Sequence, residues 1–393
     1  MTTLPCELLV AGGGVAGVCA ALAAARSGGE TLLVESHPWL GGTGTTGMLR
    51  HICGLYGTGD TVPTETLNGG LTDEIVKGLA RRAPLRTVRK MGQVYVLPYE
   101  DSDLRTVLTD LCGAERKLRV LTSSTVTEVV AGDGRIDAVC VATPDGPLRT
   151  TTDMAIDCTG NANLAALAGA TCNLSPPAER QLAGFTIRVN GLRVGDDLLS
   201  IKVPYFCAKG VEQGLLPPLL RFTTFFSGDD ADEGFCKLSL DGEEGHERDQ
   251  RAHDWSRILL SYLESVLPAF RGAGIGGTAQ AVLEREGRRV LGEYTLTGDD
   301  VLTARKFPDA VVKNAWPVEI WDRSKGTRYQ YVPEGDFYEI PLGCLRVQGV
   351  SNLLAAGRCI SATPAALAST RVMGTCMALG EQAGLAAVWC LRK

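Results

Sequence analysis

The chain has 393 residues, 45% of them hydrophobic, and this length predicts two or three domains with large cores. Its net charge of −6, with acidic and basic residues interspersed, argues against nucleic acid as a partner, and its apolar runs are shorter than the roughly 20 residues of a membrane span. The 13 cysteines form no C-x-x-C pair, so we expect no metal site and a reducing, cytoplasmic location in which most thiols are buried.

The first predicted element is a strand at residues 8–10, followed by a glycine-rich turn at residues 12–17. A helix rich in alanine extends to Arg26, and a second strand at residues 31–34 leads to Glu35. A strand, a G-x-G-x-x-G turn, a helix, a second strand and an acid, in this order, are typical of a dinucleotide-binding site. Because the chain enters a strand almost at once, we expect no signal peptide, which again favours the cytoplasm.

Each glycine of this turn has a distinct physical role. Gly12 permits the tight turn, Gly14 lets a pyrophosphate approach the backbone, and Gly17 lets the helix pack close to the strand. The helix N-terminus at Val15 offers free N–H groups to the phosphates. Glu35 can accept hydrogen bonds from a ribose diol and would repel a 2′-phosphate, so the sequence disfavours NADP.

The next elements are predicted from turn residues and apolar spacing. A loop rich in Gly and Thr covers residues 40–47, and helices are expected at residues 71–81 and from Ser102 or Asp103 onward. Three β-like runs follow, and the Gly-containing turns between them indicate a meander. The runs are residues 118–121, 126–130 and 136–141.

The composition of the sequence changes twice after this point. An apolar strand at residues 154–157 ends in a small polar turn, which suits close contact with a cofactor. Residues 171–340 hold most of the aromatic residues, several prolines and charged stretches, so we predict an inserted α+β domain there. Residues 341–393 are again rich in small and apolar residues, like the N-terminal part. Residues 1–170 and 341–393 are therefore predicted to form one discontinuous domain.

A second G-x-G-x-x-G match occurs at residues 272–277. The run before it, residues 258–270, has helical rather than strand spacing. We therefore predict a flexible connection here and no second nucleotide-binding domain.

The last part of the chain is predicted to contain a buried strand and a long helix of small residues. The strand covers residues 352–358. The helix covers residues 370–391 and is expected to be capped by Ser369 or Thr370.

Four segments carry motifs of a known family: residues 8–47, 156–161, 285–294 and 352–384. Together they resemble the FAD-dependent oxidoreductases of the glutathione-reductase-like fold, in the branch that includes the fumarate reductase and succinate dehydrogenase flavoproteins. The resemblance implies an α/β fold with a Rossmann-like FAD-binding domain in three layers, built from a parallel sheet plus a β-meander. It also implies an inserted α+β substrate domain and noncovalent FAD.

The resemblance further implies which residues bind FAD. The turn at Thr159–Gly160 would pass beneath the pyrophosphate, the backbone near Val126 would meet the adenine, and Arg358 lies in the segment of the second phosphate contact. The helix that starts near Arg371 would aim its N–H groups at the flavin, where negative charge develops on reduction. The full set of expected FAD contacts is Gly12, Gly14, Val15, Ala16, Gly17, Glu35, Ser36, Gly41, Gly42, Thr43, Thr46, Gly47, Val126, Thr159, Gly160, Asn161, Gly357, Arg358, Val372, Met373 and Gly374.

The expected chemistry is hydride transfer between flavin N5 and a small polar substrate, for which a carboxylate-bearing molecule is one option. Arg371 is the candidate substrate anchor, because the fumarate reductase branch places an arginine there; pairing with an acid or with the flavin edge is an equal alternative. His51 is the candidate general acid or base, with a loop histidine of no catalytic role as the alternative, and Cys53 is expected to be a packed thiol. Two positions depart from the family: Asn161 stands where Asp is common, and Pro364 stands where His is common.

One charged cluster lies within the resembling segments. It could bind an anionic substrate or form an ion-pair network that joins the two domains, and we favour the network. Other functions stay open: a partner-dependent or RNA-modifying flavoprotein, or an FAD- or NAD-binding protein without turnover. The electron acceptor, whether oxygen, a quinone or a soluble partner, is also open. The cluster consists of Arg285, Glu286, Arg288 and Arg289.

Overall fold

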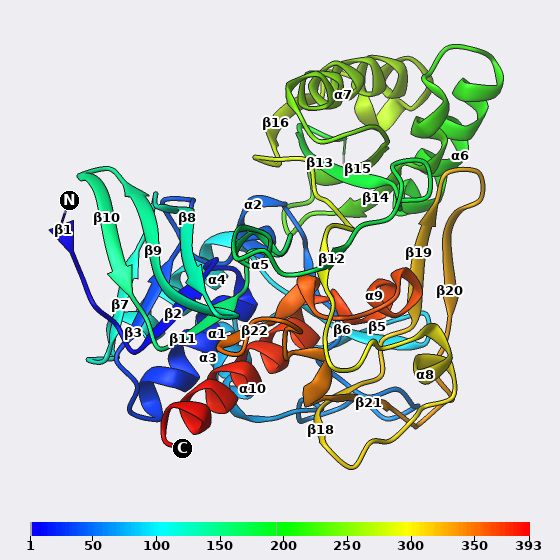
Figure 1. Ribbon diagram of the computed structural model, residues 1–393. Coiled ribbons are helices and arrows are strands. Elements are labelled where there is room, and N and C mark those ends of the chain that lie inside the picture. The colour runs from blue at the N-terminus through cyan, green and yellow to red at the C-terminus, as the bar shows by residue number, and fades with distance from the viewer. Residues whose placement is uncertain (1, 194) are drawn as a thin grey trace.

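A parallel sheet of five strands forms the centre of the first unit of the fold (Figure 1). The computed structural model describes residues 2–193 and 195–393. The strands lie in the order β22-β11-β2-β3-β7, and every neighbouring pair is parallel. Because both faces are covered, most of these strands read as continuous apolar runs rather than alternating ones. The strands are β2 (Leu8–Ala11), β3 (Thr31–Val34), β7 (Leu118–Leu121), β11 (Met154–Asp157) and β22 (Leu353–Ala355).

Helices cover one face of this sheet and a meander covers the other. Val10 belongs to the core shared with the helices, whereas its neighbour Leu9 belongs to the core shared with the meander. The first and last helices pack so closely that a Cβ on Gly380 would overlap the Ala16 carbonyl oxygen, which explains the small residues of the last helix. The helix predicted at residues 71–81 is confirmed. The helices of this layer are α1 (Val15–Arg26), α3 (Gly70–Arg82), α4 (Asp101–Gly113) and α10 (Met373–Leu391).

The meander has four strands in the order β1-β10-β9-β8. The prediction that residues 118–121 belong to it is wrong. Leu118 pairs with Thr31, so this run is the edge strand of the parallel sheet, and a short apolar run carries no signal of which sheet it joins. The strands are β1 (Thr2–Thr3), β8 (Thr125–Gly132), β9 (Arg135–Thr143) and β10 (Gly146–Thr151).

The second unit is an antiparallel sheet of four strands, in the order β14-β15-β13-β16, covered by two helices (Figure 1). Ile187, Cys236 and Leu238 point into a core that these helices share. Because side chains alternate along a strand, Thr186 and Lys237 lie on the opposite face of the sheet. The elements are β13 (Ala183–Asn190), β14 (Thr224–Ser227), β15 (Glu233–Leu240), β16 (Gly274–Thr278), α6 (Leu199–Glu212) and α7 (His246–Val266).

The second glycine-rich match lies in this unit. The prediction of a flexible connection at residues 272–277 is wrong: Ile275 pairs with Val189, so most of the segment is strand β16. Residues 279–288 continue without a helix. The match therefore lacks the strand–turn–helix context of a nucleotide-binding motif.

A long hairpin, β19 and β20, extends from the first unit to the second (Figure 1). Near its tip, a Cβ on Gly326 would lie 2.8 Å from the Phe222 ring. None of the helices in the described part of the chain is long and apolar enough to span a membrane. The remaining strands are β4 (His51–Ile52), β5 (Arg89–Met91), β6 (Val94–Pro98), β12 (Cys172–Asn173), β17 (Arg289–Val290), β18 (Ala310–Asn314), β19 (Val318–Asp322), β20 (Gly326–Gln330) and β21 (Tyr338–Pro341). The remaining helices are α2 (Thr43–Thr46), α5 (Asn163–Leu167), α8 (Gly298–Leu302), α9 (Pro364–Thr370) and the 3₁₀ turns η1 (Pro218–Phe222), η2 (Pro268–Phe270), η3 (Leu342–Cys344) and η4 (Gly357–Cys359).

The helix predicted at residues 370–391 is confirmed from Met373 onward as α10, whereas Thr370 ends a separate short helix, α9, and Arg371 and Val372 lie between the two. Val372 is extended, with φ −74° and ψ 151°, and is the N-cap of α10. Ser369, one of the two expected caps, instead donates a hydrogen bond to the Trp316 carbonyl oxygen at 2.5 Å and contacts the Tyr338 hydroxyl at 2.7 Å. The break therefore places Arg371 just before α10 rather than inside a continuous helix.

Candidate functional site

The turn after β2 has the shape of a phosphate cradle. Gly12 has φ +98°, and a Cβ there would overlap the Cys158 carbonyl oxygen; a Cβ on Gly17 would overlap the Gly12 carbonyl oxygen. Over Gly14, by contrast, the nearest described atom to a Cβ would be the Gly42 Cα, at 3.9 Å. Among the described residues no side chain caps α1, so its first N–H groups are free to meet an anion. The residues present therefore fit a dinucleotide pyrophosphate.

Glu35 is fixed at the end of β3, where the sequence predicts a ribose contact. Its carboxylate is 4% exposed and accepts hydrogen bonds from the backbone N–H groups of Gly13, at 2.6 Å, and His37, at 2.7 Å. Ser36 donates to the same carboxylate at 3.1 Å. The Glu35 carbonyl oxygen accepts from the N–H of Ser124, which brings the start of β8 beside this loop.

The carboxyl ends of β11 and β22 meet the same edge of the sheet. The Asp157 carboxylate accepts hydrogen bonds from the Thr159 N–H at 2.9 Å and hydroxyl at 2.7 Å, which shapes the turn after β11. Arg358, in η4 after β22, donates to the Gly160 carbonyl oxygen at 2.7 Å and to that of Glu284. The order of the strands thus brings the residues predicted after β2, β11 and β22 to the same edge of the parallel sheet.

The loop at residues 41–47 connects this edge to the start of α10. A Cβ on Gly44 would lie 2.8 Å from the Met373 sulfur, so the two segments are in close contact. The Thr46 carbonyl oxygen accepts from the Gln280 N–H at 2.9 Å, which ties the loop to the segment after β16. Among the described residues no side chain caps α10, but the Gly374 N–H of its first turn donates to the Cys53 carbonyl oxygen at 2.9 Å. That these residues contact FAD stays a prediction.

The polar face of the second sheet is directed toward β4 of the first unit. Lys237 on β15 pairs with Thr186 on one side and Thr224 on the other, so the three side chains share this face. One row further along, Phe226 contacts the His51 ring edge to face, with 6.0 Å between the ring centres. These contacts place the polar face opposite the segment that follows the Gly- and Thr-rich loop at residues 40–47.

A cluster of charged and aromatic residues lies at this face. Trp321 of β19 carries two cations over its ring: the Arg285 guanidinium carbon lies 3.7 Å from the ring centre and the Lys237 Nζ lies 4.7 Å from it. The Glu319 carboxylate accepts hydrogen bonds from the Trp321 indole N–H at 2.9 Å and from that of Trp316 at 3.2 Å.

Arg371 approaches the cluster from the break between α9 and α10. It donates to the Glu319 carbonyl oxygen at 3.1 Å and to the Gln181 side chain at 3.4 Å. Its Nε is buried without a hydrogen-bond partner, and none of the ion pairs within residues 2–193 and 195–393 includes Arg371. Among the roles expected for Arg371, pairing with an acid is therefore disfavoured, whereas contact with a substrate or with the flavin edge stays open.

The charges of the cluster shift one another's pKa values. Burial, together with the positive charge of Arg285, lowers the pKa of Lys237 to about 7. Burial also lowers the pKa of Arg285 to about 9, together with the charge of Arg371. Burial alone would raise the pKa of Glu319, but the charges of Arg371, Lys237 and Arg285 outweigh this and lower it. Glu319 is therefore ionised at neutral pH.

The two other reactive side chains expected in this region lie in β4 and directly after it. Burial lowers the pKa of His51 to about 4, with smaller contributions from the charges of Arg89 and Arg50. His51 is thus neutral at pH 7, which disfavours it as a general acid there. Burial raises the pKa of Cys53 to about 12, in agreement with a packed, unreactive thiol.

The charged cluster at residues 285–289 divides into two parts. Glu286 and Arg289 form a buried ion pair at 3.1 Å. Arg288 donates to the Asn161 carbonyl oxygen at 3.0 Å, and its N–H donates to the Asn161 side chain at 2.8 Å. Arg288 thus connects the two segments by hydrogen bonds, and Glu286 and Arg289 pair locally, so the favoured ion-pair network between the domains stays a prediction. Arg285 belongs to the cluster around Trp321.

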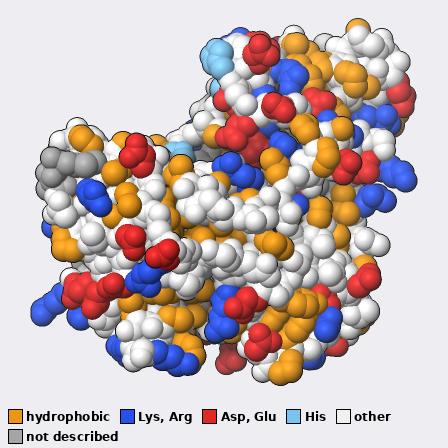
Figure 2. Space-filling model, viewed as in Figure 1, with side chains coloured by type: hydrophobic (Ala, Val, Ile, Leu, Met, Phe, Trp, Pro, Cys, Tyr) orange, Lys and Arg blue, Asp and Glu red, His pale blue; other side chains and the backbone are white. Residues whose placement is uncertain are grey.

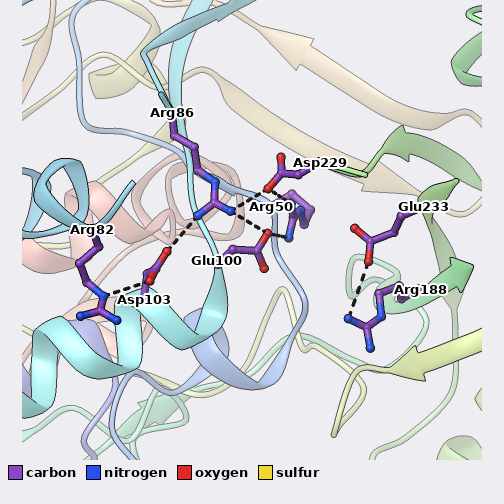
Figure 3. Close-up of polar contacts among 8 residues, drawn as sticks. All are labelled: Arg50, Arg82, Arg86, Glu100, Asp103, Arg188, Asp229 and Glu233. Carbon is purple, nitrogen blue, oxygen red and sulfur yellow. Dashed lines mark hydrogen bonds and ion pairs between the residues drawn. The ribbon is translucent and has the colours of Figure 1, made fainter. Parts of the chain in front are cut away.

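Ion pairs join the first unit to the turn between β14 and β15 (Figure 3). Arg86 lies 2.7 Å from Asp229 in this turn and 2.9 Å from Asp103 on α4. Arg50 pairs with Glu100 and lies 3.3 Å from Asp229. Individually such partly exposed pairs contribute little, but together they help to hold the second sheet over β4. On the face shown in Figure 2, Lys and Arg are interspersed with Asp and Glu, and the surface steps inward between the two units.

Sequence reasoning missed the residues of the second unit that build this cluster. Lys237 and Thr186 carry a readable signal, because residues 185–190 and 237–240 alternate between polar and apolar side chains, as in a half-buried strand. Glu319 and Trp321 carry none, since only the long hairpin brings them to this face.

Comparisons with solved structures support the fold of the chain. The chain resembles OxyS, an anhydrotetracycline hydroxylase from Streptomyces rimosus, with TM-score 0.52 and 13% identity over 99% of this chain and 62% of that one. It resembles p-nitrophenol 4-monooxygenase PnpA from Pseudomonas putida DLL-E4, with TM-score 0.50 and 11% identity over 100% and 81% of the chains. The chain thus spans less than two thirds of the OxyS structure, and at these identities the likeness shows the fold alone. No curated protein matches the sequence.

The family comparison is more specific. The profile of the family described as FAD dependent oxidoreductase matches residues 7–203 and 227–393, which is most of the chain. The glycine turn and Glu35 fit the cofactor that this family uses. The protein belongs to the FAD-dependent oxidoreductase family: it is an oxidoreductase, and FAD is its cofactor.

Proposed function

We propose that the protein transfers a hydride between FAD and a small polar substrate that binds between the polar face of the second sheet and the start of α10. The position of Arg371 carries the proposal. It directly precedes the α10 N-cap, and its guanidinium contacts Gln181 and Glu319 without forming any of the ion pairs of the described residues. A planar, charged fork without an acid partner suits a carboxylate or oxyanion of the substrate.

The two units then have separate tasks. Residues 1–170 and 341–393 would form the FAD-binding domain, with noncovalent FAD along the edge from Gly12 to Met373, and residues 171–340 would form the substrate domain. FAD, when bound, supplies hydride transfer at N5. The positive end of the α10 dipole would stabilise negative charge there. Arg371 would orient the substrate, and the second sheet would exclude water from it.

Placement in the branch of fumarate reductase and succinate dehydrogenase flavoproteins rests on the sequence motifs alone. An RNA-modifying role receives no support from the interspersed charges on the face in Figure 2. A cytoplasmic location and a small-molecule substrate are parts of the same proposal.

The experiment that tests this proposal is anaerobic reduction of the purified flavoprotein by a panel of small polar metabolites, with Arg371→Ala beside the wild type. Arg271→Ala, which removes an exposed arginine, is the matched control. We expect the wild type and the control to be reduced by at least one metabolite, and then reoxidised by oxygen, a quinone or a soluble acceptor. Protein that takes up no FAD on reconstitution, or that no metabolite reduces, would overturn the proposal.

A further inference from the structure

Resting on the function proposed above, we propose that Lys237 and Arg285 form a binding site for an anionic group of the substrate, and that Lys237 takes up a proton when the anion binds above neutral pH. Within residues 2–193 and 195–393, neither side chain forms an ion pair with a carboxylate. Arg285 is 5% exposed and donates from Nη1 to the Leu182 carbonyl oxygen, but its Nη2 is buried without a partner. A buried donor without a partner is costly unless a ligand satisfies it.

Gly184 makes room for both cations on one face of the sheet. A Cβ at this position would lie 2.8 Å from the Arg285 Nη2 and 3.4 Å from the Lys237 Cε. Both cations also lie over the same indole ring, that of Trp321. The two positive groups are therefore neighbours beside Gly184, which has no side chain, rather than separate surface charges.

Hydroxyl groups without partners surround the two cations. Thr186 and Thr224 flank Lys237 in the neighbouring strands, and Ser239 pairs with Gly184. All three hydroxyl oxygens are buried, and none has a hydrogen-bond partner among the described residues. Such a concentration of free donors on one sheet face is unusual for a packed interior and fits an anion with several oxygen atoms.

The charges of the cluster are unbalanced. Lys237, Arg285 and Arg371 face one carboxylate, that of Glu319, whose oxygens accept from the two indole N–H groups. A structural ion-pair network would place an acid beside each cation, as Glu286 lies beside Arg289 in the same segment. The excess of positive charge instead favours the binding of a negatively charged ligand.

The same imbalance explains the proton uptake. Burial and the charge of Arg285 lower the pKa of Lys237 to about 7, so that the amine is half neutral at that pH. A bound anion would favour the ammonium form and raise this pKa. The ionisable groups that face Lys237 from the surrounding elements are Arg285, Glu319, Arg371, Cys53 and His51.

Calorimetric titration of the FAD-loaded enzyme with malonate and with sulfate tests the proposal, with chloride at equal ionic strength as the baseline. We expect saturable binding that weakens roughly tenfold or more between pH 6 and pH 8.5, as the neutral form of Lys237 takes over. Titrations at pH 8 in two buffers of different ionisation enthalpy should show uptake of up to about one proton per bound anion. Lys237→Met should bind more weakly at pH 6 and take up no proton.

Two further variants complete the design. Lys325→Met removes an exposed lysine at the tip of the same β19–β20 hairpin and should behave as the wild type. Arg285→Lys keeps a charge and should retain partial binding, whereas Arg285→Gln should lose it. Absence of saturable binding, or equal proton uptake by Lys237→Met, would overturn the anion site. The proposed function would survive that result if a neutral metabolite still reduced the flavin, so the two failures can be told apart.

Discussion

Arg285 stacks on Trp321, with its guanidinium carbon 3.7 Å from the centre of the indole ring. The edge of the same indole donates a hydrogen bond to Glu319 at 2.9 Å. Trp321 thus holds a cation on its face and an anion at its edge, in accordance with the quadrupole of an aromatic ring. Because Trp321 lies on β19, it joins the long hairpin to the sheet of the second unit.

Replacement of Trp321 by phenylalanine should remove the hydrogen bond to Glu319 while keeping most of the packing. We expect the free energy of unfolding to fall by about 1–3 kcal/mol, because a buried carboxylate loses one of its two indole donors. Urea unfolding measures this. Trp389→Phe, at a side chain that is 52% exposed, should change stability by less than about 0.5 kcal/mol. Equal effects of the two substitutions would contradict the role given to Trp321.

The two glycines Gly14 and Gly17 should fail in different ways when changed to alanine. Gly14→Ala should fold normally, because its φ of −63° suits any residue and its Cβ would meet open space, but should bind FAD weakly because the methyl group occupies the phosphate approach. Gly17→Ala should destabilise the protein even without FAD, because its Cβ would overlap the Gly12 carbonyl oxygen. Flavin absorbance and thermal unfolding of the apoprotein separate the two effects. Normal FAD affinity in Gly14→Ala would argue against the cradle.

Glu35→Gln should raise the dissociation constant of FAD by about tenfold, as one charge-assisted hydrogen bond becomes neutral. Fluorescence titration of the apoprotein with FAD measures the constant. The exposed Glu30→Gln, at the other end of β3, is the control and should leave the constant unchanged. An unchanged affinity in Glu35→Gln would mean that the carboxylate serves only to hold the loop through Gly13 and His37.

Protonation of His51 should destabilise the fold. Its pKa is lowered from 6.5 to about 4 by burial, so the unfolded chain binds more protons than the folded one between these values. The stability that this histidine contributes is therefore present above about pH 6.5 and lost as the pH falls toward 4. His51→Asn should show a flatter dependence of unfolding free energy on pH in this window. Its kcat profile between pH 6 and 8 should match that of the wild type, and loss of an inflection there would show that His51 acts as an acid or base.

The sequence predicts the cofactor edge better than the substrate side, for a physical reason. Gly12 to Glu35 is one strand–turn–helix–strand unit, so its motif is local and readable. Arg371 was correctly placed near the start of the last helix, although the extended Val372 that separates α9 from α10 has no local signature. Lys237 could have been found from the alternation of β15, but Trp321 reaches it only through a hairpin with long-range pairing. Residues 118–121 pair with β3 of the parallel sheet rather than with the meander, and this long-range pairing also leaves no local signal in the sequence.

The most direct measurement of the central claim is the rate at which the bound flavin loses its visible absorbance when the enzyme is mixed anaerobically with its reducing metabolite. The account predicts that Arg371→Ala binds FAD as the wild type does but is reduced about 30-fold or more slowly, because truncating one buried charged partner costs about 2–5 kcal/mol. Arg371→Lys should recover part of the rate. Reduction of Arg371→Ala at the wild-type rate would contradict the assignment of Arg371 as the substrate anchor.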